Sequence, residues 1–155
     1  MSDLITGRVM ALDVGEKWIG VALSDPLGIL ANPLTRISAV PEEAAIQAIH
    51  RLVDEHLVKL VVVGMPYSMD GTLGRQAALV EQFMIKLRQS LRIGMETWDE
   101  RLSTLAARSR LREVPGKVGE KEQIDAAAAA YILEGYLEHR RREVQSPEEQ
   151  AGDQS

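Results

Sequence analysis

The chain of 155 residues has no cysteine, few aromatic residues and no long apolar run. The lack of cysteine excludes disulfides, thiolate metal sites and cysteine nucleophiles, and it suits a reducing compartment. Aromatic residues make up only 4% of the chain, so recognition of single strands by base stacking is poorly supported. No apolar run approaches the roughly 20 residues of a membrane span, and the start MSDLITGRV lacks signal-peptide features. We therefore expect a cytoplasmic protein without a membrane partner.

Acidic residues outnumber basic ones, 23 to 18, which gives a net charge of −5. This balance argues mildly against a protein whose main task is to coat nucleic acid. A metal site itself collects carboxylates, however, and a local basic surface can still hold phosphates. Such a surface is indicated between residues 101 and 121, where six bases stand against two acids.

Hydrophobic patterning predicts five strands and four helices. The strands are expected at 9–12, 18–24, 34–37, 59–66 and 92–98, and the helices at 41–58, 74–91, 102–113 and 123–143. A hairpin meander followed by alternating helices and strands predicts an α/β fold, with a mixed five-stranded sheet and helices on both faces. We expect one domain over residues 1–142 and a disordered tail over 143–155, where no periodicity remains.

Three acidic residues stand where a core pattern would favour another residue. Asp13 ends the first strand, Glu100 ends the last strand, and Asp125 comes directly before five alanines in the last helix. Sites in open α/β sheets form at the carboxyl ends of strands, and a run of alanines lets a helix approach a sheet closely. Converging carboxylates need a cation, and hard oxygen ligands suit Mg²⁺ or Mn²⁺. Two such ions about 3.5–4 Å apart can serve a phosphoryl transfer.

Each acid alone also has an ordinary structural interpretation. Asp13 could be a turn residue, Glu100 a solvated residue between strand and helix, and Asp125 a residue favoured near a helix N-terminus by the helix dipole. Only the three positions taken together favour a functional site.

Four segments, in this order, resemble motifs of the YqgF family of pre-16S ribosomal RNA nucleases, which are related to Holliday-junction resolvases. They are ALDVGEKWIGVALSDPLG, VVVGMPYSMDGTLG, WDERLST and IDAAAAAYILEGYL, and the resemblance covers residues 8–141. It implies a ribonuclease H-like fold and a nuclease that processes the 5′ end of precursor 16S ribosomal RNA. It also implies that Asp13, Glu100 and Asp125 are catalytic and bind two Mg²⁺ or Mn²⁺ ions, with Asp13 bridging them.

Groups that could hold substrate phosphates flank Glu100. Arg101 is the best candidate for a phosphate contact, and Ser103 and Thr104 could donate hydrogen bonds to phosphate or cap the following helix. Lys117 is a further candidate, in the loop 114–123. That loop is nearly neutral here, whereas many members of the resembled family are strongly basic there.

Two other acids compete for a place in the site. Asp99 directly precedes Glu100, and because side chains alternate along a strand, the two are not expected to face the same side. Asp70 belongs to a turn-forming segment and could reach the site from its loop.

Other functions stay open at this point. The segment LDVGEKWIGVALSD loosely matches the phosphate loop of actin-like and sugar-kinase folds, but those proteins clasp a nucleotide between two such domains, and 155 residues are too few. A Holliday junction resolvase-like DNA nuclease is a second alternative, and a non-catalytic nucleic-acid-binding module in ribosome maturation or transcription is a third. The expected partners are precursor rRNA or branched DNA, and ribosomal particles. The sequence leaves the choice between monomer and homodimer open.

Overall fold

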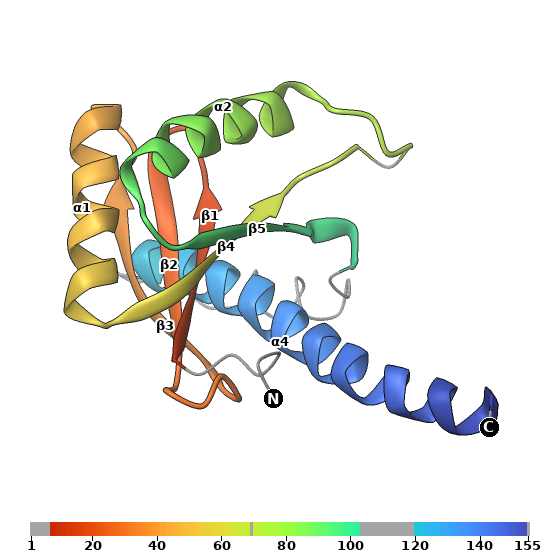
Figure 1. The fold of residues 1–155 in the computed structure, drawn as a ribbon. Helices are drawn as coiled ribbons and strands as arrows, with labels where there is room; N and C mark the ends of the chain where they lie inside the picture. The colour runs from red at the N-terminus through yellow and green to blue at the C-terminus, as the bar shows by residue number, and fades with distance from the viewer. Residues whose placement is uncertain (1–6, 69, 103–119, 155) are drawn as a thin grey trace.

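The computed structural model describes residues 7–68, 70–102 and 120–154, and it describes side chains in the last range only from 122 to 143. Its centre is one five-stranded sheet with the strand order β3-β2-β1-β4-β5 (Figure 1). The strands are β1 (Arg8–Val14), β2 (Trp18–Ser24), β3 (Ala31–Ser38), β4 (Val58–Met65) and β5 (Gly94–Asp99). The first three strands pair antiparallel, and β4 and β5 continue the sheet parallel to β1. The mixed five-stranded sheet predicted from the sequence is confirmed.

Helices cover both faces of this sheet, as predicted. The helices α1 (Glu42–Glu55) and α2 (Arg75–Ser90) lie on one face, and α4 (Glu120–Gln154) crosses the other (Figure 1). Side chains of β1 alternate between the two cores: Leu12 packs with α1 and α2, and Ala11 packs with α4. This double burial explains why β1 and β4 are nearly continuous apolar runs.

The close approach expected from the alanine run is present between α4 and β2. A Cβ atom built on Gly20 would stand only 2.6 Å from the carbonyl carbon of Asp125, and it would be closer still to the carbonyl oxygen. Ala126 and Ala129 are buried beside this contact. The backbone of α4 therefore rests directly on the backbone of β2, a contact that only glycine permits.

Several boundaries differ from the sequence-based expectations. The strand β3 begins three residues before the predicted range 34–37, and its Pro33 pairs with Ala22 next to a register shift in this edge strand. A short 3₁₀ turn, η1 (Glu100–Leu102), follows β5. The predicted helix 102–113 lies outside the described residues apart from its first position.

The end of the chain also differs from expectation in one respect. The helix α4 continues to Gln154, through most of the segment 143–155 that we expected to lack structure. The division into one domain and a tail stays a prediction. Among the described helices, none is both long enough and apolar enough to cross a membrane.

Candidate active site

Asp13 stands on the α4 face of the sheet, near the carboxyl end of β1. It alternates with Val9 and Ala11, which pack against α4, and it is half-buried. On β2 its partner is Gly20. On the other side, β1 and β4 run parallel with Leu12 opposite Val63, so the next position beside Asp13 is Gly64.

These glycine neighbours make room for Glu100 and Asp125 on either side of Asp13. The Oε1 atom of Glu100 lies 3.1 Å from the position that a Cβ atom on Gly64 would take. The main chain of Asp125 lies over Gly20. Neighbouring strands are about 4.8 Å apart, so each glycine lies one strand spacing from Asp13. The structure therefore brings the three acids to the same face and the same end of the sheet.

The side chains of Glu100 and Asp99, the two acids considered for this position in the site, make different contacts. Asp99 accepts hydrogen bonds from the Arg101 guanidinium, with 2.6 Å between Nη2 and Oδ2, and also from the Arg101 amide. The Arg101 hydrogen bond is the main cause that lowers the pKa of the Asp99 carboxyl. Asp99 is thus paired with Arg101, while the Glu100 side chain lies over β4.

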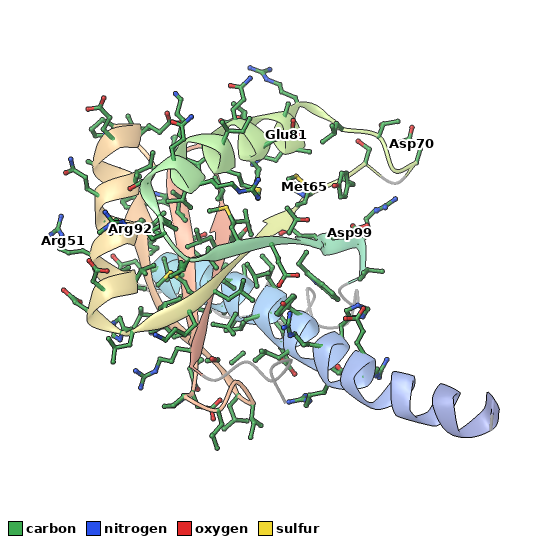
Figure 2. The ribbon with its side chains drawn as sticks, viewed as in Figure 1. Arg51, Met65, Asp70, Glu81, Arg92 and Asp99 are labelled. Carbon is green, nitrogen blue, oxygen red and sulfur yellow. The ribbon has the colours of Figure 1, made fainter. Side chains whose placement is uncertain are left out.

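Asp70 makes its hydrogen bonds within its own loop. Its Oδ1 atom accepts hydrogen bonds from the amide of Thr72 at 3.0 Å and from the Thr72 hydroxyl at 2.7 Å, and the latter is the main cause that lowers the pKa of Asp70. The charge of Arg101 also lowers this pKa. Figure 2 shows Asp70 out on the loop after β4 and Asp99 at the end of β5. These contacts give Asp70 a turn-forming role.

Arg101 belongs to a small cluster at the carboxyl ends of β4 and β5. Its guanidinium carbon lies 5.4 Å from the centroid of the Tyr67 ring. Asp99 engages the Nε and Nη2 atoms, and Nη1 lies 3.3 Å from the position of a Cβ atom on Gly71. The expected phosphate-binding arginine is thus also an ion-pair partner. The other predicted substrate-binding residues, Ser103, Thr104 and Lys117, lie outside the described residues.

The carboxylate of Asp125 is paired with an arginine that the sequence analysis did not single out. Oδ2 of Asp125 lies 3.2 Å from Nη1 of Arg36, which stands opposite Gly20 on β3. The Arg36 side chain is 15% exposed, and its guanidinium carbon lies 3.7 Å from the centroid of the Trp18 ring. In the sequence, Arg36 stood out only as a charged residue next to Ile37 in a short predicted strand. A charged residue on an edge strand usually faces solvent, so the sequence did not point to a pair with Asp125.

The acids are of the type that binds a divalent ion, but they do not form a closed ligand set. Among the side chains that the structure describes, in residues 7–68, 70–102 and 122–143, no three acidic or histidine side chains form a group able to hold a metal ion. The Glu100 carboxylate lies beside Gly64, the residue that the strand register places next to Asp13, and a larger residue at position 64 would take up this space. The third carboxylate, that of Asp125, is held by Arg36.

Comparisons with known proteins found a family model that matches most of the chain. The model of the family described as "RuvX: Holliday junction resolvase" matches residues 7–139. A relative from Roseiflexus, named "Putative pre-16S rRNA nuclease", is 46% identical over 136 residues, which are 87% of this chain and 96% of that protein. A protein of the same name from Chloroflexus aurantiacus is 48% identical over 144 residues, 91% of each chain.

Two solved structures share the fold at low sequence identity. RuvC of Thermus thermophilus, in complex with a Holliday junction substrate, has a TM-score of 0.55 and 12% identity, over 87% of this chain and 96% of that chain. The yeast mitochondrial Holliday junction resolvase has a TM-score of 0.53 and 12% identity, over 88% of this chain and 80% of its own. The expected ribonuclease H-like fold is confirmed. RuvX and YqgF are two names of one family, the one that the sequence motifs resemble. The match over residues 7–139 and the identity to these relatives show that the chain belongs to it.

Proposed function

We propose that this protein is a metal-dependent nuclease that hydrolyses phosphodiester bonds and processes the 5′ end of precursor 16S ribosomal RNA. The observation that carries the proposal is the placement of Asp13 between two glycines, with Glu100 over one and Asp125 over the other. Membership of the RuvX family and the names of the relatives support the choice of reaction and substrate.

The acids that would bind the metal belong to regular secondary structure or directly follow it. Asp13 lies in a strand paired on both sides, and Asp125 lies on a helix whose backbone touches β2. Glu100 follows β5 without an intervening loop. Two bound divalent ions would supply a water of lowered pKa and stabilise the leaving oxygen. Carboxylates mounted on strands and helices keep such a site in a narrower range of geometry than carboxylates on loops.

Arg101 would add the contact to the substrate backbone. An arginine carries five N–H donors, and the pair with Asp99 uses those on Nε and Nη2. The remaining terminal nitrogen, Nη1, lies beside Gly71 in the loop after β4. Asp99 holds the guanidinium through Nε and Nη2, and Nη1 would then donate to a phosphate oxygen of the substrate. Ser103, Thr104 and Lys117 stay further candidates for phosphate contacts.

A cleavage assay tests the proposal. A precursor 16S rRNA fragment and a four-way DNA junction are incubated with the protein in Mg²⁺, in Mn²⁺ and in EDTA. We expect metal-dependent cleavage of the RNA at its 5′ side, and its loss in Asp13→Asn. Asp54→Asn is the matched control, because Asp54 is an exposed residue of α1 paired with His50.

The other outcomes decide between the alternatives. Cleavage of the junction alone would favour a resolvase-like DNA nuclease, which the description of the family makes the second candidate. Binding of RNA without cleavage in either metal would overturn the enzyme in favour of a non-catalytic binding module.

A further inference from the structure

We propose that Arg36 is a built-in counter-cation that a divalent ion must displace from Asp125, so that Arg36 stabilises the ion-free protein and opposes metal binding. The inference rests on the metal site of the proposed function. Arg36 itself would contact neither the metal nor the substrate. Its role would be to balance the charge of the acids while no metal is bound.

The Arg36 guanidinium contacts two acidic residues of α4. Nη1 lies 3.2 Å from Oδ2 of Asp125, and Nη2 lies 3.9 Å from Oε1 of Glu122. The Nε atom is buried, and it has no hydrogen-bond partner among the described residues. Asp125 is therefore the nearest described carboxylate that balances this largely buried charge, whose side chain is only 15% exposed.

Strand register places this charge in line with the site. Arg36 pairs with Gly20, and Gly20 pairs with Asp13, so the three residues occupy one row across β3, β2 and β1. Two strand spacings are about 9.6 Å, which the long side chain of arginine partly bridges. Gly20 has no side chain to stand between them, and the backbone of Asp125 lies over it.

The sign of the effect follows from charge. Without an ion, carboxylates gathered at one end of the sheet repel one another, and Arg36 offsets part of this repulsion. A bound divalent ion would replace that favourable interaction with repulsion between two cations. Any interaction that favours the ion-free state over the bound state weakens binding of the ion by the same free energy.

The Trp18 ring would still hold the Arg36 guanidinium when the Asp125 carboxylate binds an ion instead. The guanidinium carbon lies 3.7 Å from the centroid of the Trp18 ring, within the range of a cation–π contact. Arg36 therefore keeps one favourable partner in both states, and the exchange at Asp125 does not require the arginine to leave β3.

Binding of Mn²⁺ tests the inference without any assay of activity. Calorimetry gives the affinity of wild type, Arg36→Gln, Arg36→Lys and Arg8→Gln, and thermal unfolding is followed in EDTA and in saturating Mn²⁺. Arg8 is a suitable control because it is a half-buried arginine at the other end of β1, where it donates a hydrogen bond to the carbonyl of His56.

We expect Arg36→Gln to bind Mn²⁺ about tenfold more tightly than wild type, since partly screened charges a few ångströms apart interact on that scale. Its Tm should fall below that of wild type in EDTA, and Mn²⁺ should reduce the difference. Arg36→Lys keeps the charge and should bind Mn²⁺ nearly as wild type does, and Arg8→Gln should leave the affinity unchanged.

Equal or weaker Mn²⁺ binding by Arg36→Gln would overturn the inference, and so would a loss of Tm that is the same with and without Mn²⁺. In both cases wild type still binds Mn²⁺, and the proposed function survives. If wild type binds no more Mn²⁺ than Asp13→Asn does, the metal site and the role of Arg36 both fail.

Discussion

Gly20 and Asp125 touch backbone to backbone, and this contact holds the third acid of the candidate site beside the first. A Cβ atom on Gly20 would lie 2.6 Å from the carbonyl carbon of Asp125. Neither partner can yield easily, because one is in the middle of β2 and the other is in α4. Gly20 stands between Asp13 and Arg36 in the row across the sheet, and because it has no side chain, the backbone of Asp125 can lie over it.

Replacing Gly20 with alanine should push α4 away from the sheet. We expect Gly20→Ala to lower the free energy of unfolding by about 1–3 kcal/mol, because the new methyl group meets backbone and not a flexible side chain. Chemical denaturation measures this loss. Gly94→Ala is the control, since its Cβ atom would meet only the Leu60 side chain, at 3.3 Å. A tolerated Gly20→Ala would contradict the packing described here.

Replacing Gly64 with alanine should affect cleavage more than folding. The added Cβ atom would stand 3.1 Å from Oε1 of Glu100 and would press on the end of the Ile132 side chain. Ile132 can shift, so we expect a stability loss of about 1 kcal/mol. The displaced carboxylate should lower the cleavage rate at least about tenfold, because small misplacements of catalytic groups are costly. Rates and denaturation midpoints of the same preparation separate the two effects, and an unchanged rate would argue against a role of Glu100.

The pair between Asp99 and Arg101 should make stability depend on pH. Arg101 lowers the pKa of Asp99 in the folded state below the unfolded value of 3.8, so the pair contributes stability above that value. The contribution is lost as pH falls through the lower, folded-state pKa. We expect Arg101→Gln to be less stable than wild type at pH 7, and the difference to vanish once the pH is below the lowered pKa of Asp99. Urea midpoints across this range measure the difference, and a gap that does not change with pH would contradict the pairing.

Tyr136 offers a test of packing that leaves the site untouched. Its hydroxyl donates a hydrogen bond to Glu96 on β5 and accepts one from Arg140 at 2.8 Å. Burial is the main cause that raises the pKa of this hydroxyl. Tyr136→Phe should reduce the free energy of unfolding by about 1 kcal/mol, the usual worth of such a bond. Cleavage should stay at the wild-type rate, and a large loss of activity would mean that this end of α4 takes part in the reaction.

Local patterns were enough to predict most of the fold. The continuous apolar run of β4 and the four-residue recurrence in α2 are signals carried by neighbouring residues, and both elements are found close to their expected bounds. The position of Asp13 at a strand end could likewise be read from its neighbours. The strand Gly94–Asp99 begins two residues later and ends one residue later than the predicted range 92–98.

The pairings within the site could not be predicted in the same way. Arg36 and Asp125 are 89 residues apart, and they meet only because β3, β2 and α4 bring their positions together. The pairing of Asp99 with Arg101 depends on the turn η1, which bends the chain directly after β5. Alternation along a strand was the basis for expecting Asp99 and Glu100 to diverge, but β5 ends at Asp99 and Glu100 already belongs to η1, so that rule does not apply to the pair.

The central claim is that Asp13, Glu100 and Asp125 share bound metal. Anomalous scattering from crystals grown with Mn²⁺ tests it most directly, because the peaks locate the ions without reference to activity. The account predicts peaks within coordination distance of all three carboxylates, about 2.0–2.2 Å for a small divalent ion, with Asp125 released from Arg36. Peaks elsewhere on the chain, or a map in which Asp125 stays on Arg36 while Mn²⁺ is bound, would contradict it.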